Sequence, residues 1–212
     1  MSGGTGYVGR PLAQRLGGKA HSVRVLARAE SLSKVPSGAV PVVGNALSAS
    51  TFAAQVPPGS TFIHLTGVAH PAPWKGPQFR AIDLRSLEAS AEAAKAAGVA
   101  HFVYVSVAQP APIMRPYIQV RRECEEILAG TGIPRTILRP WYVLGPRHRW
   151  PEALRPVYAL LEGIPATREG ARRLGLVRLA EMVNALVWAV ENPPRTLRIL
   201  DVPEIRLRGA DR

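Results

Sequence analysis

Three regularly spaced glycines at the start of the chain constrain its fold more than any other feature. Gly3, Gly6 and Gly9 follow the pattern G-x-x-G-x-x-G in the stretch MSGGTGYVGRPLAQRL, and a helical pattern begins directly after them. A glycine-rich turn that runs into a helix normally leaves a buried strand of a parallel sheet. The sequence therefore predicts a strand–turn–helix unit, although only Met1 and Ser2 precede the turn.

Each glycine has its own physical role in such a turn. Gly3 allows a tight exit from the strand, Gly6 lets a pyrophosphate approach the backbone, and Gly9 lets the helix pack closely on the sheet. The helix N-terminus offers free N–H groups and the positive end of its dipole to phosphates. We therefore predict a dinucleotide site at this turn. The same loop also contributes Thr5, Tyr7, Val8 and Arg10.

Beyond the turn, short β-rich runs alternate with helical patterns. Strands are predicted over residues 22–28, 39–44, 60–67, 100–107, 135–140 and 197–202. Helices are predicted over residues 79–98, 116–132, 151–164 and 179–192. Gly98 is the expected C-cap of the first of these helices, and Pro116 fits the first turn of the second. The alternation predicts an α/β fold with a doubly wound, Rossmann-like parallel sheet.

The pattern also suggests how the chain is divided. Residues 1–140 are expected to form the dinucleotide-binding domain, and residues 141–212 a small α/β cap on the carboxyl edge of the same sheet. The apolar strand that should precede Gly3 is missing. We expect that the true protein starts a few residues upstream and supplies that strand, or that another segment or chain fills the gap.

Composition limits the classes of partner. The net charge is +12, but the excess is nearly all arginine scattered along the chain, so no specific nucleic-acid function is predicted. No run approaches the roughly 18 apolar residues of a membrane span. The single cysteine, Cys124, and the lack of a signal-peptide pattern favour a cytoplasmic protein. The five histidines have no metal-ligand spacing, so no metal site is predicted.

Several motifs together resemble one superfamily. The segments GGTGYVGR, FIHLTGVAH, FVYVSV and TILRPWYVLGP, with the pair Tyr117 and Arg121 between the last two, occur in the order found in extended and atypical short-chain dehydrogenase/reductases. This is the NAD(P)-dependent epimerase/dehydratase and NmrA-like group, and the resemblance covers residues 3–146 well. It implies an NAD(P) cofactor and an unspecified small-molecule substrate. It also implies a homodimer formed through the helices that match residues 83–97 and 116–129.

The resemblance implies further cofactor contacts. In the family, one turn contacts the adenine, a second passes beneath the ribose and nicotinamide, and a proline-containing turn lines the nicotinamide. The matching positions are, in that order, Asn45 and Ala46, then Leu65, Thr66 and Gly67, then Pro140.

The choice between the two nicotinamide cofactors can be argued from charge. An NAD-preferring site usually has an acidic residue at the end of the second strand, where this chain has Arg28. A guanidinium pairs bidentately with phosphate, and Arg10 could assist it. The sequence therefore favours NADP(H) over NAD(H).

The catalytic residues depart from the family pattern. Family members that carry out redox chemistry use a serine, a tyrosine and a lysine; here Tyr117 and Arg121 occupy the Y-x-x-x-K positions, one helical turn apart. Arginine keeps the charge that stabilises a tyrosinate but not the lysine geometry. Val107 stands at the serine position, and Ser106, one residue earlier, would face the opposite side of a strand. Ser106 is therefore read as more structural than catalytic, and Tyr117 as either functional or a packing residue.

Two functions remain open at this stage. The first is an NAD(P)-dependent oxidoreductase or epimerase/dehydratase-type enzyme acting on a small carbonyl, alcohol or sugar-like substrate. The second is a non-catalytic NAD(P)-binding redox sensor or assembly factor of the NmrA-like kind, which Val107 and Arg121 favour. The basic stretch at residues 147–149 is either a contact for an acidic substrate or a solvated loop.

Overall fold

The computed structural model describes residues 1–146 and 173–210, and in this part the chain forms a parallel α/β sheet covered on both faces. One two-stranded unit consists of β1 (Arg24–Ala27) and β2 (Val40–Val43). A four-stranded unit has the order β3 (Thr61–His64), β4 (His101–Val105), β5 (Arg135–Arg139) and β8 (Leu197–Asp201), with every pair parallel. The doubly wound architecture predicted from the strand–helix alternation is confirmed.

The two units are joined by the first two residues of the chain. The Ser2 N–H donates to the Ile63 carbonyl (2.9 Å), and the Leu65 N–H donates to the Ser2 carbonyl (3.2 Å). On the other side, the Leu26 N–H donates to the Met1 carbonyl (2.9 Å). Met1 and Ser2 therefore lie in the position of the central strand, between β1 and β3. Beyond them the two strands flank a small cavity of about 80 Å³ whose lining includes Met1.

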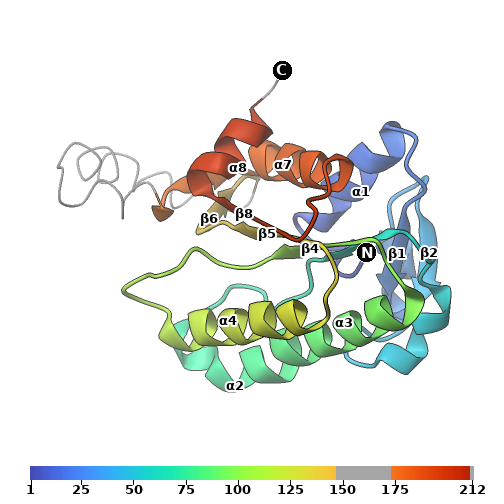
Figure 1. Ribbon diagram of the computed structural model, residues 1–212, viewed down its shortest axis with the longest axis horizontal. Helices are drawn as coiled ribbons and strands as arrows, with labels where there is room; N and C mark the ends of the chain where they lie inside the picture. Colours follow the sequence, from blue (N-terminus) through green and yellow to red (C-terminus); the bar gives the residue numbers. More distant parts are fainter. Residues whose placement is uncertain (147–172, 211–212) are drawn as a thin grey trace.

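Helices cover the two faces of the sheet (Figure 1). One face carries α1 (Gly9–Gly18), α7 (Leu179–Glu191) and α8 (Val202–Gly209). The other carries α3 (Arg85–Ala97) and α4 (Arg115–Gly130). The short α2 (Gly76–Gln78) continues through the π-helical η5 (Phe79–Leu84) into α3. Gly98 ends α3 with φ +63°, as predicted for a C-cap.

Shorter elements complete the described chain. The 3₁₀ turns are η1 (Ala29–Lys34), η2 (Ala49–Thr51), η3 (Ala53–Gln55) and η4 (Pro73–Lys75). A small parallel pair consists of β6 (Tyr142–Leu144) and β7 (Leu176–Arg178). Neither this pair nor α8 is among the elements predicted from the sequence. For the pair the reason is length, because three-residue strands give no usable periodicity. The predicted helix at 151–164 and the basic stretch at 147–149 lie outside the described residues.

A separate hydrophobic core lies on each side of the sheet. The core on the α3 and α4 side includes Phe62, Phe102 and Tyr104, and the Phe62 and Phe102 rings stack at 5.3 Å. The core under α1, α7 and α8 includes Val103 and Leu138 from the central strands. Because β4 contributes to both cores, it is buried almost throughout, which explains its near-continuous apolar sequence.

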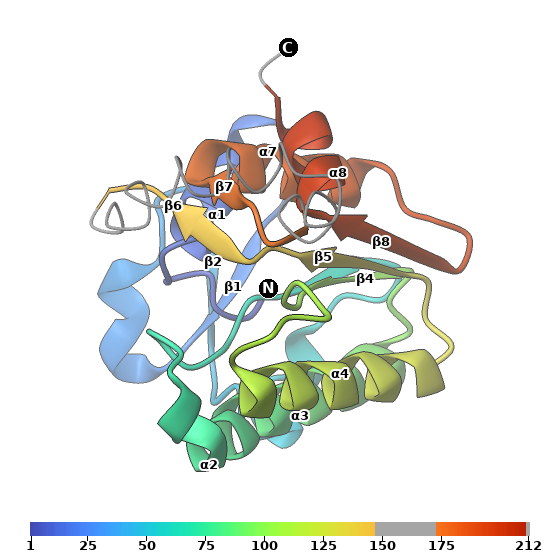
Figure 2. The same ribbon diagram turned by 90° about the vertical axis from the view of Figure 1, so that its left-hand side faces the viewer.

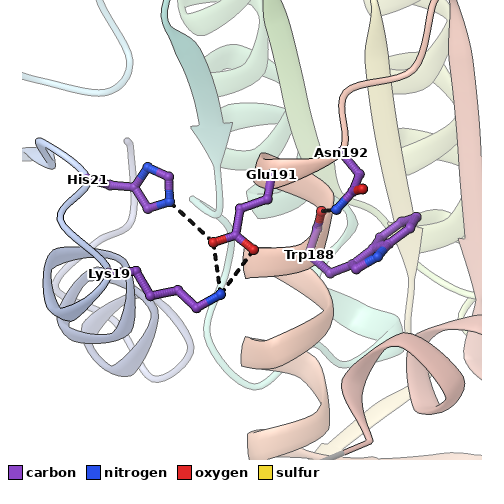
Figure 3. Close-up of polar contacts among 5 residues, drawn as sticks. All are labelled: Lys19, His21, Trp188, Glu191 and Asn192. Carbon is purple, nitrogen blue, oxygen red and sulfur yellow. Dashed lines mark hydrogen bonds and ion pairs between the residues drawn. The ribbon is translucent and has the colours of Figure 1, made fainter. Parts of the chain in front are cut away.

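At the amino edge of the sheet, an ion pair links the ends of α1 and α7 (Figure 3). The Lys19 Nζ donates to both Glu191 carboxylate oxygens (2.9 and 3.0 Å), and His21 Nε2 lies 3.4 Å from Oε1. The Glu191 pKa is lowered, chiefly by the hydrogen bond from Lys19. Beside it, the Asn192 side chain donates to the Trp188 carbonyl (2.9 Å). None of the described helices is long and apolar enough to cross a membrane.

Candidate functional site

The glycine turn lies between Met1–Ser2 and α1, at the carboxyl edge of the sheet. Gly3 has φ +73°, and a Cβ there would lie 2.7 Å from the Leu65 carbonyl carbon. A Cβ on Gly9 would collide with the Gly3 carbonyl oxygen. Only glycine therefore fits at these two positions, one for its backbone conformation and both for close packing.

Gly6 differs from these two glycines because it is exposed and faces a cleft. Its Cβ would lie 3.2 Å from the Gly3 carbonyl oxygen, so an alanine would need only a small local adjustment. The cleft has a volume of about 790 Å³, and its lining includes Thr5, Gly6, Tyr7 and Arg10. A neighbouring hollow of about 950 Å³, along α1 and α7, contains none of the predicted site residues. The smaller cleft, at the N-terminus of α1, is thus the candidate cofactor site.

The turn Leu65–Gly67 follows β3 at the same edge of the sheet. The Asp83 carboxylate accepts the Val68 N–H (2.9 Å) and so fixes the end of this turn. A Cβ on Gly67 would lie 2.5 Å from Arg121 Nη2 and 3.1 Å from Asp83 Oδ1. The glycine is therefore needed because a buried ion pair lies directly beneath the turn.

That ion pair joins η5 to α4. Arg121 Nη2 donates to Asp83 Oδ1 (2.7 Å), and the side chains of Arg121 and Asp83 are 7 % and 0 % exposed. Arg121 Nη1 also donates to the Val105 carbonyl (2.9 Å) and to the Tyr104 hydroxyl (3.1 Å). Burial raises the Asp83 pKa, and the Arg121 cation opposes that rise. The Arg121 charge, which the sequence predicts to stabilise a Tyr117 tyrosinate, is thus shared with Asp83. No sequence motif indicates this pairing.

Tyr117 packs between Arg121 and Phe79. The Arg121 guanidinium carbon lies 4.9 Å from the Tyr117 ring centroid, and the Phe79 ring centroid is also 4.9 Å away. Burial raises the Tyr117 pKa, and the Arg121 cation opposes this without reversing it. The phenol therefore stays protonated at neutral pH, which suits a proton donor better than a resident base.

Ser106 belongs to a different polar cluster. Its hydroxyl donates to Glu125 Oε1 (2.6 Å), which also accepts from Gln109 Nε2 (2.9 Å) and Arg139 Nε (3.1 Å). Arg139 Nη2 completes a bidentate pair with Glu125 (2.5 Å). The Ser106 hydroxyl is thus directed at α4 and bound to a partly buried carboxylate. Val107, at the position of the family's serine, is 3 % exposed.

The residues predicted to contact the adenine end of the cofactor lie near the ends of β1 and β2. Arg28 follows β1 and forms an exposed ion pair with Glu30 (3.1 Å), the side chains being 68 % and 63 % exposed. Asn45 follows β2, and its Oδ1 accepts the Leu47 N–H (3.0 Å) while Ala46 lies between them. Glu30 was not predicted from the sequence as a partner of Arg28, although a separation of two residues in a turn brings such side chains within reach of each other.

A buried polar cluster that sequence reasoning missed lies just before the Leu65–Gly67 turn. His64 Nδ1 is 3.0 Å from both the Ser2 and the Ser90 hydroxyls. Burial, reinforced by the nearby Arg121 cation, lowers the His64 pKa to about 3, so the ring is neutral. His64 Nε2 and Thr66 Oγ1 are buried without a hydrogen-bond partner in the described structure. A histidine inside an apolar strand was the available signal.

The last predicted residue, Pro140, directly follows β5 and is buried. Its carbonyl accepts the Ala108 N–H (3.0 Å), which ties the segment after β5 to the segment after β4. The structure thus brings the ends of β3, β4 and β5 to one edge, beside the glycine turn (Figure 2).

Comparison with known proteins identifies the family. The NAD(P)H-binding family matches residues 3–149. The chain belongs to this NAD(P)H-binding family. A short-chain dehydrogenase/reductase superfamily protein from Agrobacterium tumefaciens, with bound NAD, is among the solved structures with a similar fold, so the fold agrees with the superfamily that the motifs resemble.

Two curated relatives are similar in sequence. Ceramide reductase from Caulobacter vibrioides is 24 % identical over 211 residues, which cover 99 % of this chain and 65 % of that protein. Protein FMP52-1, mitochondrial, from Scheffersomyces stipitis is 39 % identical over 90 residues, or 42 % of this chain and 40 % of that protein. This chain thus spans less than two thirds of the length of either relative.

Solved structures show the same fold at low identity. A UDP-galactose 4-epimerase superposes with a TM-score of 0.71 at 18 % identity, covering 94 % of this chain and 74 % of that one. MoeE5 in complex with UDP-glucose and NAD gives 0.69 at 18 % identity, with coverage of 96 % and 78 %. The UDP-glucuronic acid 4-epimerase from Bacillus cereus, in complex with NAD, gives 0.66 at 18 % identity, with coverage of 94 % and 76 %.

Proposed function

We propose that this protein is an NAD(P)-dependent oxidoreductase or epimerase/dehydratase-type enzyme acting on a small carbonyl, alcohol or sugar-like substrate. The observation that carries the proposal is the glycine turn, in which Gly3 and Gly9 are held by close backbone contacts while Gly6 lies open to the cleft at the N-terminus of α1. The names of the relatives, a ceramide reductase and several sugar-nucleotide epimerases, support this reaction class.

The residues at the turn fit a dinucleotide. The backbone around Gly6 and the Gly9 N–H at the start of α1 would hold the pyrophosphate, with the Arg10 side chain at the cleft wall as a cation. The next backbone positions cannot donate, since the Arg10 N–H donates to the Gly6 carbonyl (3.0 Å) and Pro11 has no N–H. When bound, the nicotinamide would supply or accept a hydride. The chain's own contribution is then to orient the substrate at the carboxyl edge and to move one proton.

Tyr117 is the residue we assign to that proton. Its raised pKa keeps the phenol protonated at neutral pH, so it serves as the general acid in the direction of carbonyl reduction. Arg121 is a positioning residue in this scheme because it packs on the Tyr117 ring and is anchored by Asp83. Ser106, held by Glu125, has no part in the proton transfer.

The preference for NADP(H) over NAD(H) is part of the proposal. Arg28 is exposed at the end of β1, and its only acidic partner in the described structure, Glu30, is also exposed. An exposed pair of this kind is worth little, so a ribose phosphate could compete for the guanidinium. The Asn45 amide would bind the adenine edge through its Nδ2 group, since its Oδ1 is engaged with Leu47.

The first experiment tests cofactor binding by titration with NADPH and NADH. Gly6→Ala should fold like the parent yet bind NADPH at least tenfold more weakly, because the added methyl lies where the pyrophosphate approaches. Gly17→Ala is the matched control: Gly17 lies near the end of α1, the helix that follows the turn, and a Cβ there would meet nothing within 4 Å. Equal NADPH affinity in Gly6→Ala and Gly17→Ala would contradict the assignment of the cleft.

The second experiment tests catalysis. Tyr117→Phe should lose roughly 10²- to 10⁴-fold in turnover on a panel of carbonyl, alcohol and nucleotide-sugar substrates, with NADPH binding nearly unchanged. Unchanged turnover in this variant would move the proton donor to another residue.

The commitment of Ser106 to Glu125 and of Arg121 to Asp83 favours a second candidate function. A non-catalytic NAD(P)-binding sensor or assembly factor needs the glycine turn but neither of these groups at the nicotinamide. Tight NADPH binding without turnover on any substrate of the panel would favour the sensor. A cytoplasmic location and a homodimer remain predictions for either function.

A further inference from the structure

Two proline-rich loops lie at the carboxyl edge of the sheet, and one of them carries the most exposed tryptophan of the described chain. The loop after β3 carries Trp74, which is 79 % exposed, and the loop after β4 carries Ile113, which is 59 % exposed. Tryptophan has a large amphipathic side chain, and in folded proteins more than half of its surface is usually buried. Its exposure calls for a partner that takes up an indole ring.

The two loops lie side by side rather than at separate places on the surface. A Cβ built on Gly76, just after Trp74, would lie 3.6 Å from the Pro116 Cβ, just after the loop that carries Ile113. Figure 2 looks onto this edge, with α2 and the start of α4 close together. The two apolar side chains therefore belong to one surface, which we call the loop face: residues 68–76 and 108–116.

The loop face is held in place by its own sequence. Prolines occupy positions 71 and 73 in one loop and 110, 112 and 116 in the other. Lys75 Nζ donates to the carbonyls of Ala69 (3.1 Å) and His70 (3.0 Å), which closes the first loop. Because the prolines and the Lys75 hydrogen bonds restrict the backbone of these loops, burying Trp74 and Ile113 in a partner would cost less conformational entropy than in an unrestricted loop.

Charge on the loop face has one sign. Its residues include Lys75 and Arg115 but no aspartate or glutamate. The nearest acid on α4, Glu123, is already paired with Arg80 (2.7 Å). A surface that combines an exposed tryptophan, an aliphatic side chain and cations without acids matches the interface of an anionic bilayer, where indole rings and basic residues are both favourable.

We propose that the loop face docks this protein on an anionic lipid bilayer. Trp74 and Ile113 enter the headgroup region, and Arg115 meets the lipid phosphates. Lys75 adds its positive charge and one further N–H donor, since two of its three are bound to the carbonyls of its own loop. The face borders the candidate site, since one loop follows the Leu65–Gly67 turn and the other leads into the helix that carries Tyr117. Docking would therefore turn the carboxyl edge of the sheet towards the membrane. It requires neither bound cofactor nor turnover, so it stands or falls separately from the proposed function.

The test is sedimentation of the full chain with vesicles made of equal parts phosphatidylcholine and phosphatidylserine, compared with pure phosphatidylcholine. The parent should bind the anionic vesicles and bind the neutral ones more weakly. Trp74→Ser should reduce the vesicle partition coefficient on the order of tenfold, because one large apolar side chain no longer enters the bilayer. Ile113→Ser should reduce the coefficient by a similar factor. NADPH affinity and melting temperature should not change in either variant.

Leu207→Ser is the matched control. Leu207 is 62 % exposed, on α8 and away from the loop face, so its replacement should leave vesicle binding unchanged. The proposal is overturned if the parent does not sediment with the anionic vesicles, or if Trp74→Ser binds them as the parent does. It is also overturned if Leu207→Ser loses as much binding, or if Trp74→Ser abolishes a dimer of the parent without affecting vesicle binding, which would assign the face to a second copy of the chain.

Discussion

Replacing Asp83 with asparagine should destabilise this protein more than any exposed charge substitution. The change removes the carboxylate charge but keeps the size of the side chain, and it leaves the Arg121 guanidinium buried without its counter-ion. Arg121 would retain only the neutral acceptors Tyr104 and Val105. The Val68 N–H would also exchange a carboxylate acceptor for an amide, which loosens the turn after β3.

The magnitude follows from the burial of the pair. The two side chains are 7 % and 0 % exposed, and Arg121 Nη2 lies 2.7 Å from Asp83 Oδ1. Breaking a buried pair by removing one partner typically costs about 3–5 kcal/mol, because the remaining charge is uncompensated. For a chain of this size, that corresponds to a fall in Tm of roughly 6–20 °C. Such a loss is a large share of the roughly 5–15 kcal/mol that stabilises a whole domain.

Urea denaturation followed by circular dichroism measures the effect, with an unchanged m-value as evidence that the transition itself is the same. Glu123→Gln is the control, since the Arg80–Glu123 pair is 53 % and 30 % exposed and should contribute at most about 1 kcal/mol. Adding Arg121→Met to Asp83→Asn should recover at least about 2 kcal/mol, because the stranded charge is then removed.

Either of two results would refute this reasoning. A loss below about 1 kcal/mol in Asp83→Asn would mean that the aspartate is already neutral in the native state, as burial alone would favour. The absence of any recovery in the double variant would likewise show that Arg121 is not stranded by the loss of its partner.

Three further outcomes are expected. Arg28→Ala should narrow the gap between NADPH and NADH affinities by about ten- to hundredfold, whereas Glu30→Gln should widen this gap by releasing the guanidinium. Equal NADPH and NADH affinities in the parent would contradict both predictions. The His64 pKa falls from 6.5 to about 3 on folding, so between these pH values the unfolded chain binds a proton that the folded chain does not. The free energy of unfolding should therefore decline as pH drops below 6.5, by up to about 1.4 kcal/mol per pH unit. His64→Gln should flatten that decline, as measured by urea titrations at a series of pH values. Gly9→Ala should fold poorly, seen as a loss of soluble yield and of Tm, since its Cβ would meet the rigid Gly3 carbonyl.

The sequence alone determined the layer architecture and the position of the glycine turn. Strand and helix periods differ, so the alternation of β-rich runs with helical stretches predicted a parallel sheet covered on both faces. Gly3, Gly6 and Gly9 could be assigned roles because a turn that enters a helix restricts which positions tolerate a Cβ. The places of Gly98 at the end of α3 and of Pro116 in the first turn of α4 could also be predicted, since both residues act through local backbone conformation.

Other features depend on contacts between residues far apart in the chain, which no local pattern contains. Asp83 and Arg121 are 38 residues apart, and Ser106 and Glu125 are 19 apart. Residue type alone suggested a charge beside Tyr117 but could not show that a buried carboxylate shares it. In the same way, only the folded chain places Met1 and Ser2 between β1 and β3, and only packing decides that Trp74 is exposed while His64 is buried. Tertiary structure decides these points because burial and ion pairing are properties of a residue's surroundings, whereas sequence patterns report its conformational preference.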